Sequence, residues 1–336
     1  TIKDQILTCQ WCGASGPAEE FELDEQHGDG FWCPDCDGHT FYDQEKNQQR
    51  RMLLLLETST GKEDPVMPSG LKKRMSPLRY PGGKSKFIDY LAAEFKDEQM
   101  NTFVEAFAGG ASVGLALLEG ERTKHLVIND TDPGVYAFWK IVCEQPESLL
   151  EKLDRRPPVM GDLYSAKGML SSPSNWSTEA LAWAELVANR LSYSGIIKAN
   201  PLGGKHGTEK DLLVRWNPAE LKKRIRRIHG MADRITVSKV DAMALIENSA
   251  YWDQKSTLFI DPPYVTVGKA LYQRYFTDDD HRQLAWMLQT LYTGMPGADL
   301  VITYNDCELI RELYPYAEQR RVGRFFSCKI QHKLVG

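Results

Sequence analysis

From residue 76 onward, short apolar segments typical of β-strands alternate with longer segments of helical periodicity. The expected strands are 101–107, 125–130, 234–239, 256–264 and 298–305. The expected helices are 111–120, 132–145, 178–193, 218–233, 241–248, 277–292 and 306–315. Such alternation is typical of a mostly parallel sheet covered by helices on both faces. The sequence therefore predicts an α/β fold that binds ligands at the carboxyl ends of its strands.

The composition is that of a globular protein rather than a membrane or fibrous one. The chain has 336 residues, of which 42% are hydrophobic and 26% are charged. No apolar run reaches the roughly 18–20 residues of a membrane span, and the first ten residues lack the apolar core of a signal peptide. We therefore expect a cytoplasmic protein, and a chain of this length can hold one large domain plus a small one, or two medium ones.

Charge is distributed unevenly along the chain. Residues 1–70 hold 14 acidic and 5 basic residues, a net charge of −9. The other residues hold 32 acidic and 36 basic residues, a net charge of +4. This asymmetry predicts two modules with different partners.

Four of the seven cysteines form two C-x-x-C pairs, which are Cys9 with Cys12 and Cys33 with Cys36. This spacing is typical of a tetrahedral four-cysteine zinc site, and the module resembles a zinc ribbon holding one structural Zn²⁺. A redox pair and a disulfide framework are the alternatives. Because the module is acidic, we expect it to contact a protein partner, a second copy or the rest of the chain, with direct DNA contact as the alternative.

Residues 43–57 are expected to form one helix that buries its leucine run and closes a first module, 1–57. Residues 58–75 are rich in Gly, Pro, Ser and charge, which predicts a linker. The α/β domain then covers 76–336.

Three segments at expected strand ends have residues suited to binding or catalysis. Gly109 and Gly110 would let the backbone approach a ligand closely before the next helix. Asp130 follows the second strand, where an acid is the usual acceptor for a ribose diol, although a neighbouring polar residue could simply cap the next helix. The third segment is "TLFIDPPY", residues 257–264, in which an apolar strand ends in an acid, two prolines and a tyrosine.

The order of these motifs resembles the DNA adenine methyltransferase family of the Dam type. The chain reads R-Y-P-G-G-K at 79–84, F-x-E-x-F-x-G-G at 103–110, I-N-D at 128–130, A-N-R at 188–190, D-A-M at 241–243 and D-P-P-Y at 261–264. The resemblance covers about residues 75–325 and leaves out the cysteine module. It implies a Rossmann-like, S-adenosylmethionine-dependent methyltransferase fold with an inserted target-recognition region around 150–235.

The resemblance also implies roles for individual residues. The implied cofactor contacts are Tyr80, Lys84, Phe107, Gly109, Gly110, Asp130, Asp241 and Asp261. The implied catalytic motif is Asp261, Pro262, Pro263 and Tyr264. One departure is Ala106, since many relatives have proline between the equivalents of Glu105 and Phe107.

The motif at 261–264 suits transfer of a methyl group to an exocyclic amino group. Such a nitrogen is a poor nucleophile, because its lone pair is delocalised into the ring. Acceptors against its two N–H groups, here the Asp261 carboxylate and the Pro262 carbonyl, favour the tetrahedral geometry and developing positive charge of the attacking nitrogen. Tyr264 offers a ring for stacking, and a base in a duplex must be flipped out to reach such a site.

Double-stranded DNA is the expected partner. Residues 189–218 combine basic and aromatic side chains with glycines, which suits DNA contact. The candidate DNA-binding residues are Arg190, Tyr193, Lys198, Lys205, His206 and Arg215. The basic segment 221–234 fits either DNA contact or a solvated helix face. The alternative functions are N4-cytosine methylation, RNA adenine methylation, and non-catalytic nucleic-acid binding on a methyltransferase scaffold.

Overall fold

The computed structural model describes residues 51–58, 68–80, 82–95, 99–204, 206–252, 255–265, 275–294 and 297–323, and the backbone of five short strands before residue 42. Two small antiparallel sheets come first. One pairs β1 (Ile6–Thr8) with β2 (Ser15–Pro17), and the other joins β3 (Glu22–Leu23), β4 (Gly30–Trp32) and β5 (His39–Phe41). The four cysteines predicted to bind zinc lie outside the described residues, so that site stays a prediction.

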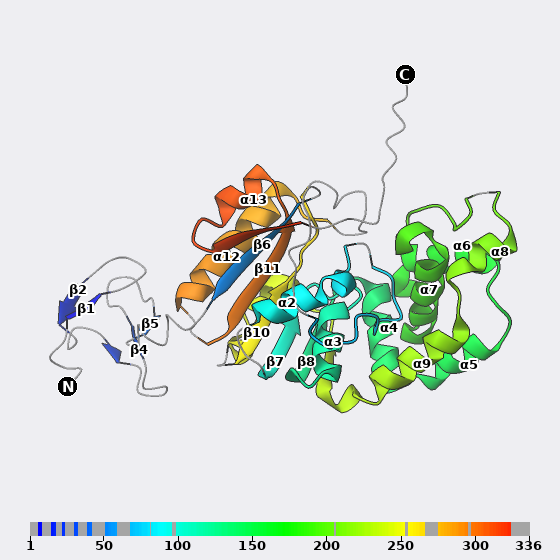
Figure 1. Cartoon of the computed structure of the whole chain (residues 1–336), viewed down its shortest axis with the longest axis horizontal. Coiled ribbons are helices and arrows are strands. Elements are labelled where there is room, and N and C mark those ends of the chain that lie inside the picture. Colours follow the sequence, from blue (N-terminus) through cyan, green and yellow to red (C-terminus); the bar gives the residue numbers. More distant parts are fainter. Residues whose placement is uncertain are drawn as a thin grey trace, which may run out of the picture.

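The centre of the molecule is a seven-stranded sheet in which all neighbours are parallel (Figure 1). Its order is β12-β6-β11-β10-β7-β8-β9. The strands are β6 (Met52–Thr58), β7 (Met100–Glu105), β8 (Thr123–Asn129), β9 (Ile235–Ser238), β10 (Ser256–Ile260), β11 (Asp299–Asn305) and β12 (Glu318–Gly323). The five predicted strands and the parallel α/β sheet are confirmed.

Helices cover both faces of the sheet, and a helical group of α5 to α9 gathers beyond the β9 end (Figure 1). The α-helices are α2 (Ile88–Glu94), α3 (Ser112–Glu119), α4 (Pro133–Glu144), α5 (Glu147–Asp154), α6 (Met160–Ser171), α7 (Thr178–Leu191), α8 (Glu209–Leu212), α9 (Pro218–His229), α10 (Ala242–Ile246), α12 (Asp278–Gly294) and α13 (Glu308–Leu313). The short 3₁₀ turns are η3 (Lys84–Lys86), η4 (Pro173–Asn175), η5 (Tyr193–Gly195), η6 (Leu213–Arg215), η7 (Ala232–Arg234) and η8 (Ser249–Tyr251). Within the described residues, every helix is too short or too polar to cross a lipid bilayer.

The prediction of a helix over 43–57 is wrong for the part that the structure describes. Residues 52–58 form β6, a strand between β11 and β12, while 43–50 lie outside the described residues. The physical reason is burial on both faces, which gives a central parallel strand a continuous apolar run without period. The α/β sheet therefore begins at β6, before the boundary predicted at residue 76.

The segment predicted as a linker is partly anchored to the domain. Met75 is buried, Lys72 pairs with Glu119 at 2.5 Å, and Lys73 pairs with Asp89. Residues 59–67 of that segment lie outside the described residues.

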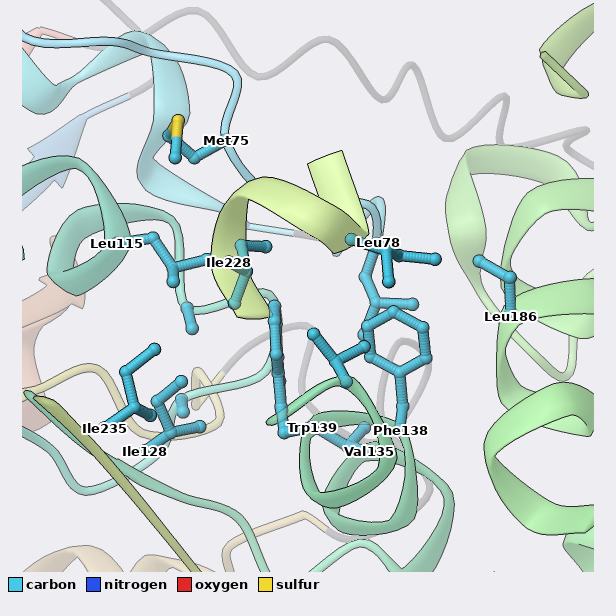
Figure 2. Packing of buried hydrophobic residues seen from close by; sticks show 14 of the residues in the cluster. Met75, Leu78, Leu115, Ile128, Val135, Phe138, Trp139, Leu186, Ile228 and Ile235 are labelled. Carbon is cyan, nitrogen blue, oxygen red and sulfur yellow. The ribbon is translucent and has the colours of Figure 1, made fainter. Parts of the chain in front are cut away.

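Alternate residues of the strands enter two apolar clusters, one on each face of the sheet. On β6, Leu53 and Leu55 join one cluster, and Leu54 and Leu56 join the other. In the first cluster, side chains from α3, α4, α7 and α9 meet around Trp139 (Figure 2). This packing holds the strand ends, and the residues that follow them, in a fixed geometry.

Candidate active site

A cavity of about 440 Å³ opens at the carboxyl ends of β7, β8 and β10. That volume lies within the roughly 300–1,000 Å³ typical of small-molecule sites. Among its lining residues are Tyr80, Lys84, Phe107, Gly110, Asp130, Asp241 and Asp261. The structure therefore brings together, around one cavity, residues that are up to 200 positions apart in the sequence, from Tyr80 to Asp280.

The glycine turn after β7 lies against the ring of Tyr80. Gly109 has a φ of +47°, and a Cβ placed on it would be 2.7 Å from the Tyr80 ring. Its carbonyl oxygen accepts a hydrogen bond of 2.9 Å from the indole N–H of Trp139. Only glycine fits this turn without strain, and its use here is close approach between backbone and ring.

The side chain of Asp130 accepts a hydrogen bond from the backbone of the same turn. One of its carboxylate oxygens accepts a hydrogen bond from Gly109 N at 2.8 Å, and the other accepts one from Asp132 N at 2.9 Å. Asp132, not Asp130, caps α4 by accepting hydrogen bonds from Gly134 N and Val135 N. Asp130 is thus a carboxylate held in place on the cavity wall, and the neighbour that caps the next helix is Asp132.

Asp241 lies at the cavity after β9. Its side chain accepts a hydrogen bond of 2.9 Å from Met243 N and so caps α10. Nearby, Asn129 ties the strand ends together by donating to the carbonyls of Ala106 and Val240, each at 3.1 Å. These bonds fix the rim of the cavity between β7, β8 and β9.

Asp261 is at the centre of a buried polar cluster. One of its carboxylate oxygens accepts a hydrogen bond of 2.6 Å from the Thr303 hydroxyl, and the other is bound by the ammonium of Lys84. Lys84 is only 3% exposed and also donates to the Tyr264 hydroxyl at 2.9 Å. Burial raises the pKa of Asp261 above its ordinary value, although Lys84 opposes the shift. A carboxylate has about four acceptor positions, so these two bonds leave capacity for a ligand N–H.

Glu105, the last residue of β7, is a second buried carboxyl on the cavity wall. Its Oε1 accepts a hydrogen bond of 2.5 Å from Gly114 N. Burial raises the pKa of Glu105 to about 8, and the nearby Asp261 adds to the shift. Glu105 is therefore mostly protonated at neutral pH, which limits the negative charge in the cavity.

The rest of the D-P-P-Y motif divides between the wall and the core. Pro263 lines the cavity, whereas Pro262 is buried. The Tyr264 ring is 3% exposed and packs near Tyr304, with 6.5 Å between ring centroids. In this conformation Tyr264 supports Lys84 through its hydroxyl and does not present a free ring face to the cavity.

The candidate DNA-binding residues do not share one environment. Tyr193 is 51% exposed, and Lys198, His206 and Arg215 are also exposed. Arg190 is buried at the end of α7, where burial and the nearby Arg224 lower its pKa to about 10. Lys205 lies outside the described residues.

The basic segment 221–234 is largely engaged with carboxylates. Lys222 pairs with Asp154 and Arg227 with Glu119. Arg224 pairs with Glu220 at 2.8 Å and also donates to the carbonyl of Ser76 at 2.9 Å. These pairings favour the helix-face interpretation of α9 over DNA contact.

Sequence reasoning missed two polar residues beside Asp261. Glu57 lies 3.3 Å from Lys84, and Thr303 donates to Asp261. Glu57 comes directly after an apolar run, as Asp261 does, and that signal was hidden because the leucine run was interpreted as a helix. Thr303 is a polar residue inside an apolar strand, which the alternation of strand faces could have marked.

Comparison with known proteins identifies the family of the chain. Residues 80–322 match the family model of the D12 class N6 adenine-specific DNA methyltransferases. The type II methyltransferase M.MjaIII of Methanocaldococcus jannaschii is 24% identical over 283 residues, which cover 75% of this chain and 92% of that protein. The Retron Ec67 DNA adenine methylase of Escherichia coli is 26% identical over 247 residues, covering 70% of this chain and 79% of that protein.

Proposed function

Because the chain belongs to the D12 class N6 adenine-specific DNA methyltransferase family, its reaction is methylation of adenine N6 in DNA, and we propose that the cavity beside Asp261 is where transfer occurs. The observation that carries the proposal is Asp261 itself. Its carboxylate lies on the cavity wall, fixed by Thr303 and Lys84.

The cavity fits S-adenosylmethionine, the methyl donor expected for this family. When bound, this cofactor supplies an electrophilic methyl group on a sulfonium. Three observations support the fit: Gly110 on the cavity wall, where the backbone can approach a ligand, the Asp130 carboxylate behind the glycine turn, and Asp241 at the rim. Asp130 would accept hydrogen bonds from the ribose diol, Asp241 would bind the cofactor adenine, and Tyr80 would lie beside the methionine end.

Asp261 and the Pro262 carbonyl would accept hydrogen bonds from the two N–H groups of the target amino group. This arrangement localises the nitrogen lone pair and stabilises the positive charge that develops on N6. The C–N bond would form as the C–S bond of the sulfonium breaks, and N6 would then lose one proton to solvent. The two prolines lack N–H donors, so the turn offers acceptors without competing donors. Reaching the cavity requires the adenine to be flipped out of the duplex.

The test uses the full chain with radiolabelled S-adenosylmethionine and either DNA or RNA, followed by identification of the methylated nucleoside. We expect label in N6-methyladenine from DNA. We also expect Asp261→Asn, which keeps the shape but loses the charge, to reduce kcat by at least about a hundredfold. The matched control is Asp233→Asn, at an exposed residue of η7 that does not line the cavity, and this variant should keep its activity. Label in N4-methylcytosine, or in RNA alone, would contradict the proposal.

For the cysteine module we propose one structural Zn²⁺ held by Cys9, Cys12, Cys33 and Cys36. The support is their spacing, since two C-x-x-C pairs can supply four thiolates to one metal. The module's net negative charge supports docking onto protein surfaces, including a second copy, rather than broad contact with phosphates. Metal analysis should give about one zinc per chain. The variant Cys33→Ser should lose it and Cys143→Ser should keep it, whereas a metal-free folded protein would refute the site.

We further propose that the exposed residues Tyr193, Lys198, His206 and Arg215, with Lys205 on the same segment, contact DNA. Their support is exposure and chemistry, because cationic side chains bind phosphates and an aromatic ring can stack on bases. Buried Arg190 would act indirectly, by supporting the segment that follows α7.

A further inference from the structure

One strand of the central sheet comes from outside the region that matches the family model. The match covers residues 80–322, whereas β6 covers Met52–Thr58. In the sheet, β6 lies between β11 and β12 and pairs with both in parallel (Figure 1). A segment that the family model does not include thus occupies an internal position of this fold.

The pairing of β6 places Glu57 at the same edge of the sheet as Asp261. Glu57 lies opposite Asn305 of β11 and Val322 of β12, and its carbonyl oxygen accepts a hydrogen bond of 2.9 Å from Asp306 N. Its residue exposure is 2%. Burying a carboxylate to this degree is costly unless a positive group lies beside it.

That positive group is Lys84. Its ammonium lies 3.3 Å from Glu57 Oε1, while it donates to Asp261, to the Tyr264 hydroxyl at 2.9 Å and to the Gly82 carbonyl at 3.1 Å. An ammonium has three protons, and Asp261, Tyr264 and Gly82 accept hydrogen bonds from it, while Glu57 Oε1 contacts it as an ion pair. Glu57 therefore competes with Asp261 for the same cation.

We propose that Glu57 is a positioning residue of the methyl transfer: it holds Lys84 between two carboxylates, so that Asp261 stays available to the target amino group. Strand β6 then contributes a residue to the active site, in addition to its place in the sheet. This inference rests on the proposed role of Asp261, and it adds a residue that the family match does not cover.

Charge in the cluster supports this role. Glu57 and Asp261 share one cation, and the negative charge of Glu57 raises the pKa of Asp261 while Lys84 lowers it. Without Glu57 the ammonium would bind Asp261 alone and more tightly. The titratable groups that act on Asp261 from the surrounding elements are Lys84, Glu57, Glu105 and Tyr304, and the Tyr264 hydroxyl accepts a hydrogen bond from Lys84.

The first experiment compares Glu57→Gln with wild type in steady-state kinetics across pH. We expect kcat to fall about ten- to a hundredfold, because the reacting acceptor is held more tightly by Lys84. We also expect the acid limb of the kcat profile to move to lower pH, since Asp261 loses a negative neighbour. KM for S-adenosylmethionine should change less than about threefold.

Arg51→Gln is the matched control. Arg51 precedes β6 and pairs with Glu94 at 2.9 Å and Glu318 at 2.7 Å, far from Lys84. This variant loosens the strand without changing the cluster, so its acid limb should stay where it is in wild type. An unmoved limb in Glu57→Gln, or an equal fall of kcat in Arg51→Gln, would overturn the proposal.

A double-mutant cycle with Lys84→Met separates this inference from the proposed role of Asp261. If Glu57 acts through Lys84, adding Glu57→Gln to Lys84→Met should change single-turnover rates by less than about twofold. Full additivity would overturn the proposal about Glu57 even if Asp261→Asn is inactive. If Asp261→Asn instead stays active, the proposed acceptor role itself is wrong.

Discussion

At the scale of single residues, burial and one lysine limit the net negative charge of the acidic side chains at the cavity. Asp261 and Glu57 contact one lysine, Glu105 lies on the same cavity wall, and burial raises the pKa values of Glu105 and Asp261. An acid that is neutral at the working pH needs no partner cation. Glu105 can thus occupy the cavity wall while Lys84 remains with Asp261 and Glu57.

Glu105→Gln tests whether this acid is neutral in the folded protein. Because the pKa of Glu105 is raised to about 8 in the folded protein, its contribution to stability is present below its unfolded pKa and is lost as pH rises through about 8. Glutamine cannot ionise, so the variant should gain stability relative to wild type as pH rises from about 4.5 to 8. The difference should grow by up to about 1.4 kcal/mol per pH unit. Urea unfolding at several pH values measures it, and a difference independent of pH would contradict the assignment.

At the scale of elements, sequence pattern predicted strands whose apolar runs are bounded by glycine, proline or acids. It failed at β6 because Met52 to Leu56 are all buried, and an uninterrupted apolar run has no period to separate strand from helix. It also failed at β12, which is an edge strand with mostly exposed side chains and no apolar run to reveal it.

The same limit applies to the active site. Asp130 and Asp261 could be predicted, because each follows a recognisable strand and the ends of parallel strands share one edge. The ion pair between Glu57 and Lys84 could not, because it depends on which two strands flank β6 in the sheet. Local sequence pattern does not determine strand order, so it could not predict that β6 places Glu57 beside Lys84.

Leu54→Ala tests whether β6 is part of the cooperative core. Leu54 is fully buried, and removing its side chain should cost about 2–5 kcal/mol of unfolding free energy. The control is Val214→Ala, at a side chain 66% exposed, which should cost less than about 0.5 kcal/mol. Denaturant unfolding measures both, and equal small costs would mean that β6 is not required by the sheet.

At the scale of the whole molecule, the charge asymmetry separates an acidic N-terminal part from a mildly basic remainder. Basic side chains in the remainder differ in their burial. Lys222, Arg224 and Arg227 of α9 are partly buried in ion pairs with carboxylates, whereas Lys198 and Arg215 are exposed on the segment after α7. Sequence alone could not separate these two groups, because burial depends on the tertiary environment of each side chain.

The salt dependence of DNA binding distinguishes the two groups. Removing one cation that binds a phosphate should reduce the slope of log K against log salt by about 0.9. Replacing both Lys198 and Arg215 by glutamine should therefore lower that slope by up to about 1.8. Lys222→Gln should leave it nearly unchanged, because Lys222 already pairs with Asp154. Fluorescence anisotropy with a duplex at several salt concentrations measures the slopes. If Lys222→Gln lowered the slope by as much per cation as the double variant does, α9 would also contact DNA. If the slope of the double variant equalled that of wild type, the segment after α7 would not contact DNA.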